Sequence, residues 1–438
     1  MKHNIVLLGF LFCSFLLITQ KTFAQETLTL EEAVRIALER NYDIKLVSNE
    51  LKIDQNNVNR ANAGMLPVVG ATLTNNNTLQ NSSQTRATGE VTERNGAKGS
   101  SLNYGVGLTW TVFDGFGMFA RYDQLKELQK LGEAQLQNTV LTKVGDVITI
   151  YYDLVQQQQQ LRALDTAVAI SRLRVETAQN RFQIGKAARL EVLNAQVDFN
   201  TDTTNLLRQR QLYRNTQTQL NEQLAREVTT AFKVVDSVTI DDQLTLGQLA
   251  EQATQQNPAL QAALINRRVA ALDLKQVKAN RFPTINLNSG YNFNRSESAL
   301  GFATQTTGRG LNYGVSASVN VFNGFLQKKN ERNAAILIDN AQLQYEQLQV
   351  SIKAQLATAF ETYQTNLSLV NLEERNQRIA KQNLDITLDK FRLGSITPIE
   401  VRDAQLNYVN ATVRYSNALY QAKLAEVDLK EIAGALNF

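Results

Sequence analysis

A pattern of alternating apolar and polar residues occurs twice in the chain, at 102–116 and again at 311–325. In both stretches large apolar side chains alternate with Asn, Gly, Ser or Thr. A period of two predicts a β-strand with one apolar and one polar face, and about ten residues is the length that crosses a bilayer at a tilt. A strand of a soluble sandwich would alternate too, but it would rarely be the only β signal in a helical chain. The pattern therefore favours transmembrane strands.

Each of these strands is expected to pair with a strand that follows a proline. Apolar residues alternate after Pro67 and again after Pro283. The segments 75–101 and 294–310 are rich in Asn, Ser, Thr and Gly, a composition typical of exposed loops. The sequence thus predicts two β-hairpins, at 66–113 and 283–322.

The longest predicted element is a helix over 116–183, which contains no proline and is about 100 Å long. Its apolar residues recur every seventh position from Val140 to Phe182, a heptad pattern that predicts a coiled-coil seam. A weaker seam runs from Ile336 to Ala357. Because a helix of this length cannot bury its faces inside one small domain, it must pack along other long helices.

Two shorter helices accompany the long one. The first is expected over 30–63, with Thr29 and Glu32 as a capping box at its start, and the second over 190–226. Placed end to end, the two about equal the long helix, so they could line it as one antiparallel partner.

The mature sequence consists of two tandem copies, 25–240 and 241–438. Each copy is predicted to contain a helix, a β-hairpin, a long helix, a tight turn and a returning helix. The second copy is shorter between its strands, which marks that segment as a surface loop. Glycines at 185 and 394 end the long helices as left-handed caps, and Pro398 fits the first turn of the returning helix.

The N-terminus carries the features of a secretory signal peptide over 1–24. Lys2 precedes a short apolar run, and Thr22-Phe23-Ala24 forms a small-residue cleavage site. Cys13 lies inside the apolar run without the small residue that a lipoprotein signal needs before it, so we do not expect lipidation. No other stretch is long and apolar enough for a transmembrane helix.

Composition argues against several classes of function. The only His and the only Cys fall within 1–24, so the mature chain has no disulfide, no thiolate or imidazole metal ligand and no Ser–His or Cys–His pair. With 45 basic and 41 acidic residues in the full chain, charge gives no case for nucleic acid. We expect no catalytic residue, no metal site and no cofactor.

Together, the duplicated hairpin-and-long-helix unit and the repeated turn motif resemble the TolC family of outer-membrane efflux proteins. The motif is a basic residue, Phe, two residues and Gly, followed by an acidic residue, Val, two residues and Ala-Gln. The resemblance implies a mostly α protein with transmembrane β-strands: a homotrimer with a 12-stranded β-barrel, four strands per subunit, and a long α-barrel. An oligomer also follows from physics, since four strands cannot close and an open sheet edge is not tolerated in lipid. Dimer and trimer would both close; three comes from the resemblance.

The same resemblance implies two kinds of site. The tips at the helical turns dock a periplasmic adaptor, and acidic residues on the last helix form rings that narrow the tunnel, attract cations and raise one another's pKa by repulsion. A solvated acidic face is the alternative for these acids. A basic residue often found two positions after the tip glycine is Ile396 here, so ion pairs that lock the gate of some members are not expected. The matching residues are Ile184, Gly185, Lys186, Leu393, Gly394 and Ser395 at the tips, and Glu400 and Asp403 in the ring.

The sequence therefore predicts a passive exit duct in the cell outer membrane, with a periplasmic helical tunnel. Its partners would be two further copies of itself, membrane lipid, a periplasmic adaptor (membrane fusion) protein and, through the adaptor, an inner-membrane pump. The duct would carry small molecules or exported protein and would have no enzymatic activity. One alternative is a periplasmic coiled-coil adaptor, which would have short β-rich flanking modules and one helical hairpin where this chain has two hairpin units. The other is a structural coiled-coil protein, which would lack the paired alternating strands.

Overall fold

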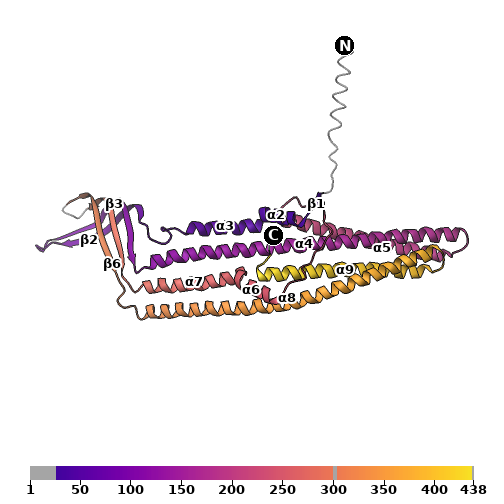
Figure 1. Ribbon diagram of the computed structural model, residues 1–438. Helices are drawn as coiled ribbons and strands as arrows, with labels where there is room; N and C mark the ends of the chain where they lie inside the picture. Colours follow the sequence, from indigo (N-terminus) through magenta and orange to yellow (C-terminus); the bar gives the residue numbers. More distant parts are fainter. Residues whose placement is uncertain (1–25, 299–302, 437–438) are drawn as a thin grey trace, which may run out of the picture. The chain divides into compact units, whose positions relative to one another are not determined.

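A computed structural model describes residues 26–298 and 303–436, so the predicted signal peptide lies outside the described residues. The long helices α4 and α8 dominate the fold (Figure 1). No helix within the described ranges combines the length and the hydrophobicity needed to span a membrane. The helices are α2 (Leu30–Arg40), α3 (Tyr42–Asn57), α4 (Gly117–Gln183), α5 (Arg189–Gln223), α6 (Leu246–Gln256), α7 (Pro258–Ala279), α8 (Leu326–Arg392) and α9 (Pro398–Ala433).

The chain divides into two compact units, and both sequence copies contribute to each. Unit 1 comprises residues up to 46, 138–257 and 351–438, and unit 2 comprises 47–137 and 258–350. Because α4 and α8 each pass from one unit to the other, the duplicated halves are interleaved in the fold.

Unit 2 contains a four-stranded antiparallel sheet with the order β2-β3-β5-β6. Its strands are β2 (Val68–Thr85), β3 (Val91–Asp114), β5 (Thr284–Ser298) and β6 (Gln305–Ser318). Since β3 belongs to the first copy and β5 to the second, the two predicted hairpins join into one sheet through the β3–β5 pairing.

The two faces of this sheet differ sharply in chemistry. On one face apolar side chains pair across the strands: the Tyr104 ring stacks on Phe293 at 4.9 Å, and Val106 lies opposite Tyr291. On the other face small polar residues bond across the strands, as where the amide of Asn292 donates to Asn312 at 2.9 Å. The apolar side chains of this sheet are largely exposed, so the described part of the chain leaves the apolar face without cover.

The strands are much longer than predicted. Most of 75–101 and 294–310, expected as loops, belongs to β-strands of 18, 24, 15 and 14 residues. The prediction was wrong because it required apolar alternation, whereas backbone pairing also holds an antiparallel ladder of polar residues together. In the second copy the hairpin predicted over 283–322 ends earlier, at Ser318.

The turn from the last strand of each hairpin into the long helix is the same in both copies. Gly115 and the following Phe116 have φ values of 72° and 68°, and Gly324 and Phe325 have 62° and 64°. A left-handed conformation is uncommon for phenylalanine, so its occurrence at both equivalent positions shows that the duplication extends to backbone geometry.

The core of unit 1 lies around the middle of α4. Val147 and Leu154 of the predicted heptad seam are fully buried there, together with residues of α2, α5 and α9. Toward the end of α4 the seam residues are less buried, and Phe182 is exposed. The four residues of the weaker seam on α8, from Ile336 to Ala357, are all exposed, so no described part of this chain covers them.

A small parallel sheet attaches the start of the described chain to residues 227–245, the connector at the junction of the two copies. Strand β1 (Glu26–Leu28) pairs with β4 (Phe232–Val234). The hydroxyl of Tyr151 on α4 donates to the carbonyl of Leu28 at 3.0 Å and accepts from the amide of Val235 at 3.1 Å. One buried tyrosine therefore fixes both strands to the long helix.

The helix predicted over 30–63 is broken at Asn41 into α2 and α3, and its equivalent breaks at Asn257 into α6 and α7. The side-chain oxygen of Asn41 accepts from the amide of Asp43 at 2.9 Å, and its side-chain amide donates to the carbonyl of Gln223 at the end of α5. Asn257 donates likewise to the carbonyl of Ile432 at the end of α9. Each asparagine thus joins three helix ends.

The predicted cap at the start of α2 is present in part. The Thr29 hydroxyl accepts from the amide of Glu32 at 3.2 Å. This bond satisfies one of the free amides of the first turn.

We expect Asn41→Ala to lower the free energy of unfolding by about 1–3 kcal/mol, because it removes a helix cap and leaves the partly buried carbonyl of Gln223 without its donor. Chemical denaturation followed by circular dichroism measures the loss. Asn49→Ala is the matched control, because Asn49 lies on the exposed surface of α3 and accepts from Lys52. Equal stability of the two variants would contradict the role of Asn41.

Candidate functional site

Both long helices end in the same cap, as predicted. At the first turn the amide of Lys186 donates to the carbonyl of Arg181 at 2.7 Å, and Gly185 has φ +76°. At the second, the amide of Ser395 donates to the carbonyl of Lys390 at 3.0 Å, and Gly394 has φ +74°. The amide of each glycine also donates to the carbonyl three residues before it. At each turn the two bonds together form the Schellman motif, which ends a helix at a left-handed glycine.

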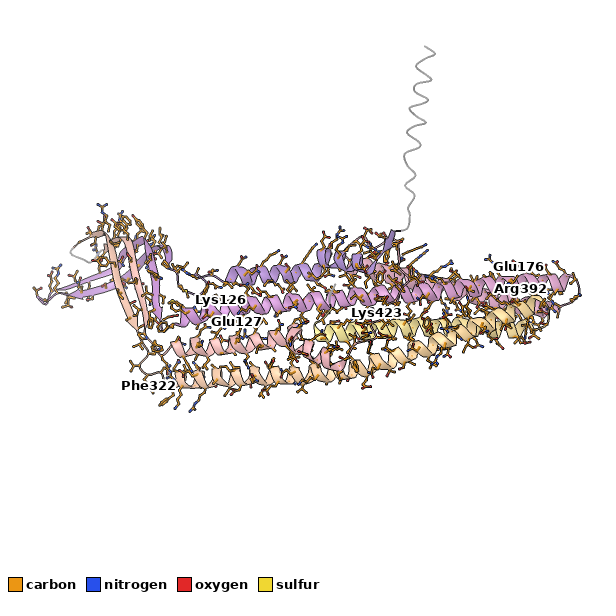
Figure 2. All side chains as sticks on the ribbon, viewed as in Figure 1. Lys126, Glu127, Glu176, Phe322, Arg392 and Lys423 are labelled. Atoms are coloured by element: carbon orange, nitrogen blue, oxygen red, sulfur yellow. The ribbon has the colours of Figure 1, made fainter. Side chains whose placement is uncertain are left out.

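The residues around both tip glycines are largely exposed. Ile184 and Leu393, which precede the glycines, keep 66% and 83% of their surface exposed, and a side chain added at either glycine would meet nothing within 4 Å. Both turns lie at the same end of unit 1 (Figure 1), next to Glu176 on α4 and Arg392 on α8, which are labelled in Figure 2. Two exposed apolar side chains on rigid turns at one end suit a docking surface.

Glu400 and Asp403, the predicted ring acids, both lie on the exposed side of α9, while Val401 between them is buried. Glu400 also forms a capping box with Thr397, whose amide and hydroxyl donate to its carboxylate at 3.1 Å and 2.8 Å. These bonds lower the pKa of Glu400. Repulsion between the carboxylates of a ring would instead raise the pKa of Glu400. The bonds from Thr397 oppose that effect and favour the charged form of Glu400.

A buried ionic cluster, absent from the sequence predictions, lies behind these acids. Arg402 on α9 donates through Nη1 to both carboxylate oxygens of Asp202 on α5, at 2.9 Å and 2.8 Å. Asp202 is only 4% exposed and also accepts from Ser171 and Gln405, each at 2.8 Å. Because α4 and α5 come from the first copy and α9 from the second, the cluster ties the two helical hairpins together.

The cluster had a weak signal in the sequence. Asp198 and Asp202 lie four residues apart on one helix, and Arg402 and Gln405 lie three apart on another, so each pair shares a helix face. That these faces meet could not be read from spacing.

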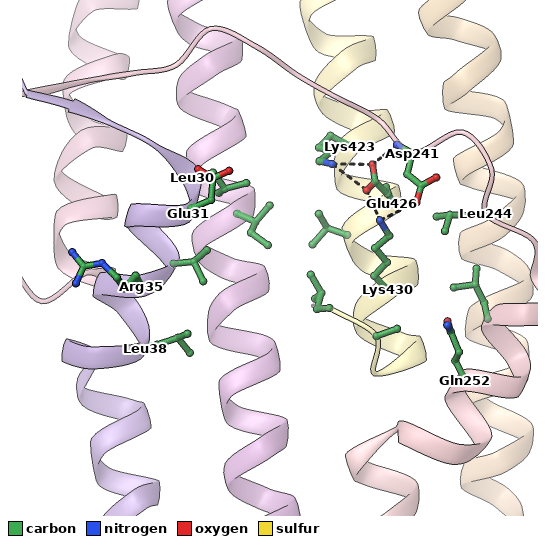
Figure 3. A pocket seen from close by; sticks show the side chains of 16 residues that line it. Leu30, Glu31, Arg35, Leu38, Asp241, Leu244, Gln252, Lys423, Glu426 and Lys430 are labelled. Carbon is green, nitrogen blue, oxygen red and sulfur yellow. Dashed lines mark hydrogen bonds and ion pairs between the residues drawn. The ribbon is translucent and has the colours of Figure 1, made fainter. Parts of the chain in front are cut away.

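A second charged cluster lines a cavity of about 760 Å³ in unit 1, shown in Figure 3. The Glu426 carboxylate accepts from Lys423 at 3.0 Å and from Lys430 at 2.8 Å, and Lys430 also binds Asp241 at 3.2 Å. Two hydrogen bonds lower the pKa of Asp241: the one from the backbone amide of Gln243 has the larger effect, and the one from the Lys430 ammonium has the smaller. Every charge in this cluster has a partner, so it joins α9 to the connector between the copies.

Within the described ranges, no group of three or more His, Cys, Asp or Glu side chains is placed to hold a metal ion. The cluster around Arg402 contains two carboxylates, and both carboxylates bind arginine. The ion pairs of this cluster therefore balance the buried charges and hold the helices together near the tips.

A sequence model of the family described as outer membrane efflux protein matches residues 33–226 and 249–435. The two ranges cover most of the chain, and each falls within one predicted copy. The chain belongs to the outer membrane efflux protein family. As a member of this family it is an outer-membrane channel subunit of an efflux or secretion system, with a periplasmic helical tunnel.

Curated relatives and solved structures agree with the family. The outer membrane protein TolC of Escherichia coli K12 is 21% identical over 362 residues, covering 79% of this chain and 72% of that protein. TolC of Vibrio cholerae is 25% identical over 332 residues, covering 72% and 73%. Among structures, the Campylobacter jejuni CmeC outer membrane channel aligns with a TM-score of 0.77 at 16% identity, covering 93% of this chain and 85% of that one. Vibrio cholerae VceC aligns at 0.71 and 16%, covering 92% and 96%. The predicted fold class, mostly α with a β portion, is confirmed.

Proposed function

We propose that this chain forms a homotrimeric, passive exit duct for small molecules or exported protein, without enzymatic activity of its own. The observation that carries the proposal is the sheet of unit 2, with one exposed apolar face and one polar face. An apolar outer face and a polar inner face are what a strand wall needs between lipid and water. Removal of residues 1–24 on export would deliver the chain to the periplasm.

The strand number supports an oligomer. In the described sheet β2 and β6 each pair on one side only, and unpaired edges are not tolerated in lipid. Three copies would give twelve strands, an even number within the range of bacterial barrels. The exposed seam on α8 supports the same proposal, because a coiled-coil stripe that the described chain leaves uncovered suits contact with a neighbouring chain.

The experiment that tests this function is single-channel recording of the mature protein in planar bilayers, with the subunit number measured in detergent by native mass spectrometry. We expect discrete conductance steps and a mass of three chains. A water-soluble monomer that gives no conductance would overturn the proposal and favour the alternative of a periplasmic coiled-coil adaptor or structural protein.

We also propose that the two tips dock a periplasmic adaptor protein, through which an inner-membrane pump is coupled to the duct. Support comes from the exposure of Ile184 and Leu393 and from the matching caps that present them. Lys186 and Ser395, which follow the glycines, would lie at the edge of the same surface.

Replacing both tip glycines with leucine should weaken adaptor binding by at least about tenfold. A left-handed leucine costs about 1–2 kcal/mol at each turn, and its side chain would occupy the proposed contact surface. Binding of the purified adaptor by surface plasmon resonance is the measurement. Gly324→Leu is the matched control, since Gly324 has φ +62° and open space around it but lies at a strand-to-helix turn. Normal adaptor binding by the tip variant would remove the docking assignment.

A further inference from the structure

Two adjoining cavities of unit 1 meet at the charged cluster around Glu426. The larger, about 760 Å³, is the one in Figure 3, and the smaller is about 470 Å³. Both volumes fall in the range of small-molecule sites. Because the two cavities have five lining residues in common, one molecule could extend from one into the other. The common residues are Leu30, Glu31, Asp241, Lys423 and Glu426.

The larger cavity has a mainly apolar lining. Residues of α2, α4, α6 and α9 form its walls, together with the connector at the junction of the copies. Such a lining suits a hydrocarbon chain, which gains free energy when it leaves water. The apolar side chains include Leu30, Val34, Ile148, Leu249, Val427 and Leu436.

The smaller cavity is lined by several hydroxyl groups, and among them Tyr152 on α4 stands out. Its side chain is only 8% exposed, and the Nζ of Lys423 lies 5.4 Å from the centre of its ring. Its hydroxyl forms no hydrogen bond within the described part of the chain, yet it is not sealed off from the cavity. A hydroxyl in such a place gains from a bound molecule that supplies a hydrogen-bond partner.

Two carboxylates lie near this hydroxyl. Burial, followed by the charges of Glu426 and Glu31, raises the pKa of Tyr152 to about 12, so the hydroxyl stays protonated at neutral pH. Both carboxylates line the smaller cavity. The hydroxyl therefore lies on the cavity side of its ring, near the place where the two cavities meet.

The charges of the lining leave one acid without a partner. Lys423 and Lys430 bind Glu426, and Arg35 pairs with acids of its own helix. The carboxylate of Glu31, in contrast, has no ion pair or hydrogen bond with any described residue. Figure 3 shows Glu31 on α2 and Glu426 on α9 at opposite sides of the larger cavity. A cation that enters between them would meet an unpaired negative charge.

We propose that the two cavities bind an amphiphilic primary amine with a medium-length alkyl chain. The protonated amino group has three donors, and it bonds with the Glu31 carboxylate and the Tyr152 hydroxyl. The alkyl chain packs in the larger cavity against Val34, Leu249 and Val427. An anionic amphiphile fits less well, because its head would lie beside the unpaired Glu31. The site lies within unit 1 and depends on neither the trimer nor the channel function.

Octylamine is a suitable probe, since it is protonated at neutral pH. Its controls are 1-octanol, which keeps the chain without the charge, and butylamine, which keeps the charge with a shorter chain. Equilibrium dialysis against the purified full chain measures binding, and equal detergent in both chambers cancels partition into micelles. We expect saturable binding of one octylamine per chain, with each control at least about tenfold weaker. Binding of 1-octanol or butylamine as tight as that of octylamine would overturn the proposal.

Variants of the lining locate the site. Glu31→Gln should weaken octylamine binding at least about tenfold by removing the charge, and Ala435→Phe should do the same by filling the larger cavity, which Ala435 lines. Tyr152→Phe should weaken it by about threefold, the loss of one hydrogen bond. Glu39→Gln is the matched control, because Glu39 is exposed on the same helix and lines neither cavity. Glu31 is itself exposed, so Glu31→Gln should fold normally. Unchanged binding by Glu31→Gln or by Ala435→Phe would reject the site.

Discussion

Replacing Arg402 with methionine should lower the free energy of unfolding by about 3–5 kcal/mol, the typical cost of removing one partner from a buried ion pair. The Asp202 carboxylate, 4% exposed, would keep its bonds from Ser171 and Gln405 but lose its counter-charge. The loss should be large because Arg402 also contacts Asp198, so the substitution removes a second contact to the helical hairpin of the first copy. Chemical denaturation followed by circular dichroism measures the change.

Two comparisons separate the charge from the loss of side-chain packing. Arg392→Met removes an arginine from an exposed pair with Asp389, for which we expect a loss of less than about 1 kcal/mol. Combining Arg402→Met with Asp202→Asn removes both charges while leaving the amide able to bond with Ser171 and Gln405, so most of the stability should return. A double variant as unstable as the single one would show that packing, and not the unpaired charge, accounts for the effect.

The features that the sequence predicted well are those decided by local signals. The long helices follow from stretches without proline, and the turns at Gly185 and Gly394 follow from a glycine after a helical run. In the structure α4 begins one residue from the predicted start and ends at the predicted residue, Gln183. These elements need no information about their neighbours in space.

The helix break at Asn41 was missed although its signal was present. Pro258 directly after Asn257 fits the first position of a new helix, and the alignment of the two copies places Asn41 at the equivalent position. Comparing the copies position by position would have predicted both breaks. The Asn41 bond to Gln223 in another helix could not be predicted, because it depends on tertiary packing.

The strand lengths and the buried cluster around Arg402 could not be predicted from the pattern of residue types along the chain. The polar continuation of β2 and β3 has no alternation to detect, since its stability comes from backbone pairing. Arg402 lies between two exposed acids and reads as part of the same polar face, yet it is mostly buried against Asp202. Whether a charge is solvated or paired depends on which helix lies opposite, and spacing within one helix does not contain that information.

Replacing both acids of the proposed ring, as Glu400→Gln with Asp403→Asn, should raise the concentration of a trivalent cation that half-blocks the channel by at least about tenfold. In a trimer the change removes every carboxylate of the two rings, and each carboxylate contributes about 1 kcal/mol to the attraction of a multivalent cation a few ångströms away in water. Single-channel current as a function of cation concentration is the measurement.

These substitutions isolate charge because glutamine can replace glutamate in a capping box. After Glu400→Gln the side-chain amide oxygen can still accept from the Thr397 amide, so α9 should keep its start. Thr397→Val is the complementary control: it removes the hydroxyl that bonds to Glu400 at 2.8 Å but leaves the charge, so the block should persist. Asp389→Asn tests a nearby exposed acid on α8 outside the ring and should also leave the block unchanged. If the double variant is blocked as strongly as the native channel, Glu400 and Asp403 form only a solvated face, and the constriction must lie elsewhere along the tunnel.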